Sequence, residues 1–92
     1  MVIEMSYTVY ILLSKKDKNL YVGCTQNLQK RLKAHDDGAV RTTRNRRPLV
    51  IIHAERFNDK ASAFNRERYL KSLWSARYKR KLKEDFLKRA KP

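Results

Sequence analysis

Apolar residues in the first two thirds of the chain occur as short runs of the kind that form β-strands. Residues 7–13 and 19–25 are rich in β-branched and aromatic side chains and predict two strands. The polar segment 14–18 between them suits a hairpin loop of about five residues. A third run, residues 49–57, begins with aliphatic residues directly after Pro48, which predicts a strand covered on both faces.

The segment that follows the second strand predicts a short helix. Thr25 or Asn27 offers an N-cap for a helix over residues 27–36, because a short polar side chain can accept a hydrogen bond from a free amide of the first turn. Gly38 stands where a glycine commonly ends a helix. The residues at helical spacing within this segment are Leu28, Leu32 and His35.

Two further helices are predicted in the C-terminal third of the chain. Asn58 or Asp59 would cap a helix over residues 60–73, and Ser75 would cap another over residues 75–89. The inward face of the first is expected to carry Ala63, Phe64, Glu67, Leu70 and either Lys71 or Trp74. The resulting order β-β-α-β-α-α predicts an α+β fold, a small three-stranded antiparallel or mixed sheet with flanking helices.

Length and composition limit what this chain can be. With 92 residues, of which 41% are hydrophobic, we expect residues 1–92 to form one folded domain rather than a disordered chain. The longest apolar run, residues 9–13, is far shorter than the ~20 residues of a membrane span, so no membrane partner is expected. Glu4 interrupts the N-terminal apolar stretch, which argues against a signal peptide. The single cysteine, Cys24, excludes an internal disulfide, and we predict a cytoplasmic location.

Charge points to the class of partner. Lys and Arg number 23 and Asp and Glu number 9, so the formal net charge is +14. Such a field attracts polyanions, and nucleic acid is the partner that we expect, with an acidic protein or an anionic membrane surface as alternatives. The loop over residues 39–48 is especially basic, and its side chains Thr42, Thr43 and Asn45 could add hydrogen bonds to phosphate.

Five polar or aromatic side chains could form a site, although each also has an ordinary structural explanation. They are Tyr10, Tyr21, Arg31, His35 and Glu67. The two tyrosines belong to neighbouring strands, and Arg31 and His35 share a helix face. Tyrosines in strands usually pack, an arginine can lie along its helix, a histidine near a helix end interacts with the helix dipole, and Glu67 can pair with Lys71 four residues later. On these residues alone, the chain is a basic α+β nucleic-acid binder with a candidate cluster.

The joint spacing of these residues resembles the GIY-YIG nuclease domain. The matching segments are Thr8-Val9-Tyr10, Tyr21-Val22-Gly23, Arg31, His35, and the helix that carries Glu67. The resemblance spans residues 7–80 and is closest to the small single-domain bacterial group of the family. Two features depart from the family pattern: Thr8 replaces the leading glycine, and residues 72–92 hold no counterpart of a further asparagine that many members carry. No attached DNA-binding domain is expected.

The resemblance implies a divalent-metal-dependent endonuclease that hydrolyses phosphodiester bonds in DNA, of branched or irregular structure, in a process such as DNA repair; RNA is not excluded. It implies that Glu67 holds one Mg²⁺ or Mn²⁺ ion, that Arg31 neutralises phosphoryl charge, and that Tyr10 or Tyr21 activates water. His35 would form a hydrogen bond to phosphate or to a tyrosine, Gly23 would let the backbone approach closely, and Asn27 would cap the helix. Contacts to phosphate are expected from Arg41, Arg44, Arg46, Arg47 and Lys71.

Two other functions are compatible with the same residues. One is a nucleic-acid-binding module that keeps the nuclease fold but has little activity without a protein partner. The other is a basic adaptor in RNA or ribosome biology. The enzyme is favoured because a pure binder has no need of a carboxylate, Glu67, that faces phosphate.

Overall fold

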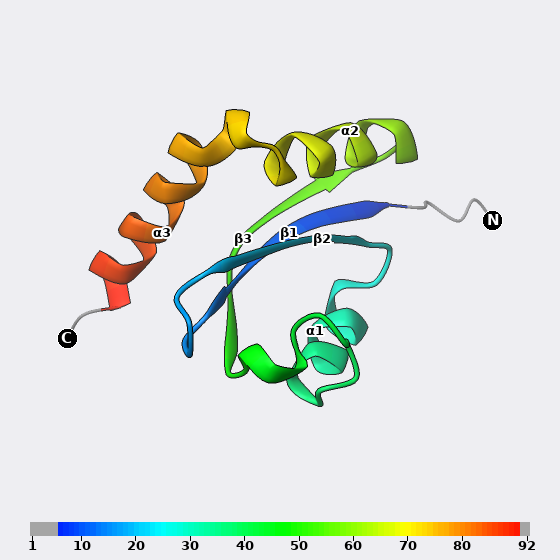
Figure 1. The fold of residues 1–92 in the computed structure, drawn as a ribbon. Coiled ribbons are helices and arrows are strands. Elements are labelled where there is room, and N and C mark those ends of the chain that lie inside the picture. Colours follow the sequence, from blue (N-terminus) through cyan, green and yellow to red (C-terminus); the bar gives the residue numbers. More distant parts are fainter. Residues whose placement is uncertain (1–5, 91–92) are drawn as a thin grey trace.

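The computed structural model describes residues 6–90, and its centre is a three-stranded antiparallel sheet (Figure 1). The strands are β1 (Tyr7–Ser14), β2 (Leu20–Thr25) and β3 (Leu49–Phe57), and their order across the sheet is β2-β1-β3. The predicted strands are therefore confirmed, and the sheet is antiparallel rather than mixed. The segment around Glu4, on which the expectation about a signal peptide rests, lies outside the described residues.

The expectation that the third strand is covered on both faces is wrong. The strand that is covered on both faces is β1. It pairs with both neighbouring strands, and its residues 9–13 are buried. β3 lies at an edge of the sheet, and Ala54 and Arg56 in its second half are exposed. A continuous aliphatic start therefore did not distinguish a central strand from an edge strand that a helix covers in part.

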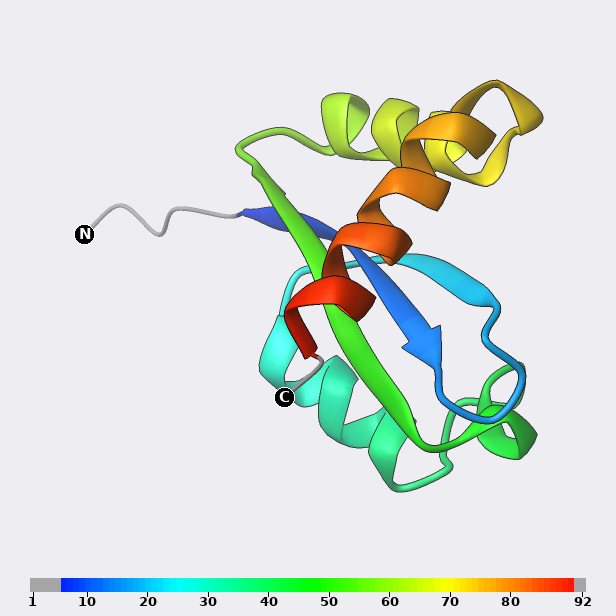
Figure 2. The same ribbon diagram turned by 90° about the vertical axis from the view of Figure 1, so that its left-hand side faces the viewer.

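Three α-helices and two short 3₁₀ turns complete the order β-β-α-β-α-α. The helices are α1 (Leu28–Asp36), α2 (Lys60–Lys71) and α3 (Ala76–Ala90), and the turns are η1 (Arg44–Arg46) and η2 (Leu73–Ser75). Figure 1 shows α1 and α2 on opposite sides of the sheet, and Figure 2 shows α3 crossing in front of the strands. No helix within residues 6–90 is long and apolar enough to cross a membrane.

The predicted capping residues fix the ends of α1 and the start of α2. The Asn27 side chain accepts a hydrogen bond from the Lys30 amide at 3.0 Å, and Gly38 has a φ of 79°, in the left-handed region that favours glycine. The Asp59 carboxylate accepts a hydrogen bond from the Ser62 amide at 2.8 Å. These short-range signals place α1 and α2 close to where the sequence predicts them.

The end of α2 differs from the prediction. Helix α2 stops at Lys71 because Ser72 has an extended backbone, so helical spacing does not extend to Trp74, which is 88% exposed. Phe64 is also exposed rather than inward-facing. Ser75 is not an N-cap for the last helix: its hydroxyl donates to the carbonyls of Leu70 and Ser72, so it stabilises the C-terminal end of α2.

Alternation along β1 divides the interior into two parts. Val9 and Ile11 face α2 and form an apolar core with Ala63 and Leu70. Tyr10, between them in sequence, points to the opposite face, toward α1. The candidate site residues of the strands therefore lie on the α1 side, whereas Glu67 comes from the α2 side.

Candidate active site

The two tyrosines of the sheet lie next to each other. Tyr10 of β1 is paired with Gly23 of β2, and Tyr21 precedes Gly23 by two residues, so both side chains point to the same face. Their ring centroids are 6.3 Å apart with an interplanar angle of 41°. A Cβ atom at Gly23 would lie 2.4 Å from the Tyr10 hydroxyl, so only glycine leaves room for this phenol.

His35 of α1 joins the two tyrosines. Its ring lies edge-on to both, with centroids 5.8 Å from Tyr10 and 5.1 Å from Tyr21. Nε2 is 2.9 Å from the Tyr10 hydroxyl, and Nδ1 is 2.7 Å from Oγ1 of Thr43. Burial, and next the positive charge of Arg31, lower the pKa of His35, so the ring is neutral at pH 7.

Thr43 is a member of this cluster that the sequence did not reveal. It is fully buried, so the expectation that it contacts phosphate is wrong. It belongs to the basic loop but turns inward to His35, eight residues earlier in the chain. No pattern in the loop marks it, because it has the same residue type as its exposed neighbour Thr42. Below, the tyrosine–histidine cluster means Tyr10, Tyr21, His35 and Thr43.

Arg31 lies at the solvent side of this cluster. Its interaction with the Tyr10 hydroxyl, and to a smaller extent with that of Tyr21, raises the pKa of the guanidinium. Burial raises the pKa of Tyr10 most, Arg31 opposes this effect, and the charge of Glu67 adds to it. Tyr10 therefore carries its proton at neutral pH.

Glu67 approaches the cluster from α2. Its Oε2 is 3.0 Å from Nζ of Lys71, so the pair expected on structural grounds is present. The side chain of Glu67 is 21% exposed and lines a cavity of about 300 Å³ together with Phe64, Arg68 and Lys71. Burial first, and then the Glu67 charge, raise the pKa of the Cys24 thiol. The carboxylate is thus close enough to influence both Tyr10 and Cys24, although no hydrogen bond joins it to either within the described chain.

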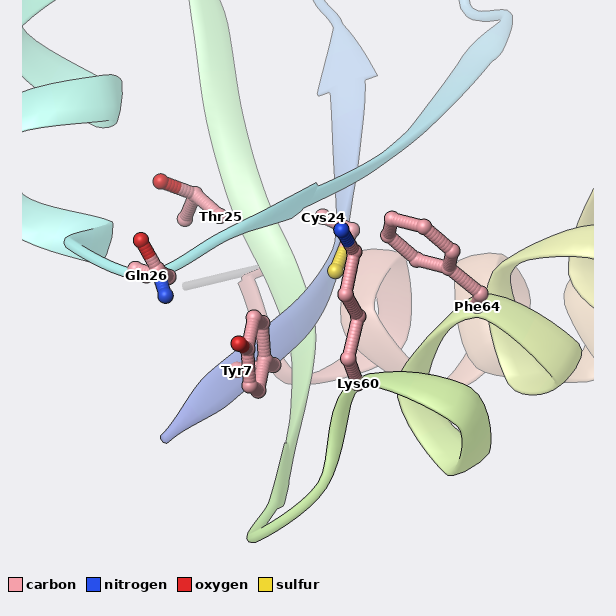
Figure 3. Close-up of a pocket in the computed structure, with 6 residues that line it drawn as sticks. All are labelled: Tyr7, Cys24, Thr25, Gln26, Lys60 and Phe64. Carbon is pink, nitrogen blue, oxygen red and sulfur yellow. The ribbon is translucent and has the colours of Figure 1, made fainter. Parts of the chain in front are cut away.

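Figure 3 shows the residues that line a second cavity beside α2. It has a volume of about 260 Å³, and Phe64 borders both cavities. Lys60 lies with its Nζ 5.2 Å from the centre of the Phe64 ring. The remaining lining residues are Tyr7, Cys24, Thr25 and Gln26. The surface beside Glu67 therefore combines aromatic, polar and cationic groups over more than one cavity.

A metal ion at this site would depend on Glu67. Within residues 6–90, no group of three or more His, Cys, Asp or Glu side chains could hold a metal ion. Mg²⁺ commonly keeps several waters and is bound through one or two carboxylates together with substrate phosphates. A single, partly exposed carboxylate on a cavity wall fits an ion of this kind that is shared with the substrate.

The arginines of the basic loop are placed differently from one another. Arg44 donates to the Gly38 carbonyl at 2.9 Å, and Arg47 donates to the Asp36 carbonyl at 3.1 Å; both remain exposed. Arg46 pairs with Asp17 at 3.0 Å and is half-buried. Arg41 is exposed, and its side chain makes no hydrogen bond or ion pair within the part of the chain that the structure describes.

Comparisons with known proteins agree with this arrangement. Residues 6–82 match the family model of the GIY-YIG catalytic domain. A UPF0213 protein of Natronomonas pharaonis is 42% identical over 73 residues, which are 78% of this chain and 85% of that protein. A UPF0213 protein of Clostridium perfringens is 47% identical over 70 residues, which are 75% of this chain and 73% of that protein.

A solved structure shares the fold. The solution NMR structure of a UPF0213 protein from Bacillus halodurans matches with a TM-score of 0.55 and 35% identity, over 85% of this chain and 82% of that one. The fold, the clustered tyrosines and histidine, and the family match over residues 6–82 therefore lead to one conclusion. The chain belongs to the GIY-YIG family, whose catalytic domain implies nuclease activity on a nucleic acid and, in general, a requirement for metal.

Proposed function

We propose that this protein is a divalent-metal-dependent endonuclease that hydrolyses phosphodiester bonds in DNA. The observation that carries the proposal is the cluster in which His35 contacts both Tyr10 and Tyr21, with Arg31 four residues earlier on the same helix. Glu67 supports the proposal from the α2 side, where its carboxylate lines a cavity and its charge raises the pKa of Tyr10. Two hydroxyls, a cation and a carboxylate are the groups needed to activate water and to stabilise charge on a transferring phosphoryl group.

The two tyrosines have different parts in this proposal. Tyr10 is fully buried and is held by His35, so it cannot reach a substrate water. Tyr21 packs against the same histidine but remains half-buried, with access to solvent. Tyr21 is therefore the general base that removes a proton from the attacking water, and Tyr10 is a positioning residue.

His35 links the buried hydroxyls of the tyrosine–histidine cluster. Its Nε2 lies 2.9 Å from the Tyr10 hydroxyl and its Nδ1 lies 2.7 Å from Oγ1 of Thr43. Because a neutral imidazole has one donor and one acceptor nitrogen, His35 can bond to both hydroxyls at once, which holds the Tyr10 ring in place.

Charge stabilisation is divided between Arg31 and Glu67. Arg31 neutralises charge that develops on the phosphoryl oxygens. Glu67 would hold one Mg²⁺ or Mn²⁺ ion, which when bound polarises the phosphate and stabilises the leaving oxygen. Because Lys71 lies 3.0 Å from the Glu67 carboxylate, its ammonium would have to move toward the substrate phosphate as the ion binds.

The substrate proposed is DNA of branched or irregular structure, in a process such as repair, with RNA as a possible second polymer. The net charge of +14 supports a polyanion. The cysteine is free, which supports a cytoplasmic location.

The test is cleavage of nicked, flapped, branched and duplex DNA and of RNA, each with Mg²⁺, with Mn²⁺ and with chelator. We expect cleavage of at least one irregular DNA that stops with chelator. The existing Glu67–Lys71 ion pair favours one rival, a binding module whose carboxylate is satisfied internally. If the protein binds these substrates but cuts none with either metal, the binding module replaces the enzyme as the function.

A further inference from the structure

Among residues 6–90, the two most exposed large hydrophobic side chains are neighbours in the sequence, at a corner of the structure. Leu73 is 92% exposed and Trp74 is 88% exposed. Both belong to η2, the turn that joins α2 to α3, and Figure 2 shows this turn at the outer edge of the structure. An exposed tryptophan leaves a large apolar surface in water, which is unusual unless something binds to it.

The backbone that carries these two side chains is well held. The Ser75 hydroxyl is buried and donates to the carbonyls of Leu70 and Ser72, both at 3.0 Å, and the Ser72 hydroxyl donates to the Tyr69 carbonyl at 2.6 Å. Leu70, one turn earlier, is fully buried in the core. The display of Trp74 is therefore a fixed feature of the fold, and binding would not have to order this turn.

The charge around the turn is almost entirely positive. Residues 66–83 contain eight basic side chains and one acidic side chain, Glu67. The eight are Arg66, Arg68, Lys71, Arg77, Lys79, Arg80, Lys81 and Lys83. Exposed Arg68, Lys71 and Arg77 lie on the two sides of the turn. A partner must therefore present a flat apolar surface together with closely spaced negative charges.

A nucleic acid with unpaired bases has both properties. Aromatic side chains in basic grooves bind single strands by stacking on successive bases, whereas the bases of an intact duplex are already stacked on one another. Lys71, the last residue of α2, lines the Glu67 cavity, and Trp74 follows it by three residues. The exposed aromatic surface and the cations of the turn therefore suit a strand with unpaired bases.

We propose that Trp74 is a stacking platform for an unpaired nucleobase, with Leu73 beside it and Arg68, Lys71 and Arg77 on the flanking phosphates. This inference rests on the proposed function, because it assigns the substrate class of that same site: nucleic acid with single-stranded or splayed nucleotides. It explains why a small domain displays a tryptophan among so many cations.

The only tryptophan of the chain is Trp74, so fluorescence excited at wavelengths that tyrosine does not absorb reports on this turn alone. The experiment titrates the full chain, with chelator, using a short oligothymidylate and a blunt hairpin duplex with the same number of phosphates. We expect strong quenching with the oligothymidylate and little with the hairpin. Fluorescence unchanged while the oligothymidylate binds, as measured by anisotropy of a labelled strand, overturns the proposal.

Variants sharpen the same experiment. Trp74→Ala should weaken binding of the oligothymidylate by roughly 5- to 150-fold, the range that base–aromatic stacking gives, and Trp74→Phe should restore most of it. Hairpin binding should change less than about twofold, because phosphate contacts remain. Circular dichroism and thermal unfolding should be unchanged, since the side chain is exposed. Equal oligothymidylate binding by Trp74→Ala and wild type contradicts the proposal.

Other occupants of the turn give different results. If it binds a second copy of the chain, sedimentation shows concentration-dependent association that Trp74→Ala abolishes, with no quenching by oligothymidylate. If it binds an anionic membrane surface, vesicles of phosphatidylserine and phosphatidylcholine shift the fluorescence and the oligothymidylate does not. Either result overturns the proposal. Quenching without any cleavage would support the stacking platform and contradict only the nuclease function. Cleavage without quenching would support the nuclease function and overturn the stacking platform.

Discussion

The two sides of the sheet contribute to the site in opposite ways. On the α1 side, Tyr10, His35 and Thr43 are buried and joined by hydrogen bonds of 2.9 and 2.7 Å. On the α2 side, Glu67 and Lys71 are partly exposed and form an ordinary ion pair. Buried, fully bonded groups are held rigidly, whereas exposed charges can exchange partners. The buried groups of the α1 side are therefore suited to positioning, whereas the charges of the α2 side are free to exchange partners with a bound ion or a phosphate.

The largest effect is expected for a substitution on the α2 side. Glu67→Gln keeps the size and polarity of the side chain but removes the anionic ligand that a hard divalent cation prefers. Cleavage should fall by two or more orders of magnitude, while stability changes by only about 0.3–0.5 kcal/mol because the Lys71 pair is exposed. Initial cleavage rates and urea unfolding of one preparation measure both.

The matched control for this variant is Glu84→Gln, an exposed carboxylate on α3 that removes the same charge. It should leave cleavage close to the wild-type rate. If Glu67→Gln cuts as fast as Glu84→Gln, the metal does not depend on Glu67, and the two sides of the sheet are not divided as proposed.

The next effect separates the two tyrosines. Tyr21→Phe should lower the cleavage rate by roughly 10²–10⁴-fold, the value of a general base, with little change in stability. Tyr10→Phe leaves the His35 ring without its buried partner and should cost about 1–3 kcal/mol of stability, with a smaller loss of rate.

The pH profile provides a second measurement of the same difference. General-base catalysis by Tyr21 predicts that wild-type cleavage rises with pH, and Tyr21→Phe should flatten most of that rise. The opposite pattern, with Tyr10→Phe flattening the profile, would assign the base to the buried ring. A flat wild-type profile, with chemistry shown to be rate-limiting, would argue against either tyrosine.

The difference between the two sides also explains what the sequence could predict. Local signals, such as the strand runs, the Asn27 and Asp59 caps and Gly38, identified the elements closely because neighbouring residues determine them. The motif spacing identified Tyr10, Tyr21 and His35, whose rings lie together, and the glycine that leaves room for Tyr10 is part of that motif.

Long-range features were not predictable in the same way. Thr43 turns inward because a loop closes over His35, and nothing local distinguishes it from Thr42. The exposure of Trp74 depends on Ser72 leaving the helix, which helical periodicity does not show. Phosphate contacts were expected from all four arginines of the basic loop, yet tertiary contacts place Arg46 against Asp17 and hold Arg44 and Arg47 on backbone carbonyls.

A smaller effect is expected on the α1 side, where His35 makes the stability of the protein depend on pH. Burial and the Arg31 charge lower the pKa of His35, with Asp36 opposing them, whereas an unfolded histidine titrates near pH 6.5. Below about pH 6.5 the unfolded chain therefore binds a proton that the folded chain does not, and stability falls as the pH is lowered. The slope approaches at most about 1.4 kcal/mol per pH unit until the folded pKa is reached.

This slope is measured by urea unfolding at about pH 7.5, 6.5 and 5.5. His35→Gln should reduce the slope, although it also lowers stability at every pH because it disturbs bonds to Tyr10 and Thr43. Equal slopes in wild type and His35→Gln would mean that His35 is not buried in its neutral form.

The smallest expected effect concerns the two kinds of arginine in the basic loop. If about four to six phosphates are neutralised, a plot of the logarithm of the binding constant against the logarithm of the salt concentration should have a slope of roughly −4 to −5. Arg41→Ala should reduce that slope by about 1 without changing stability, because Arg41 is exposed and makes no ion pair among the described residues. Arg46→Ala should change the slope less and lower the unfolding midpoint slightly, since Arg46 is half-buried against Asp17. Equal slopes for both variants, read from fluorescence anisotropy at several salt concentrations, would show that the fold does not divide these arginines between structure and binding.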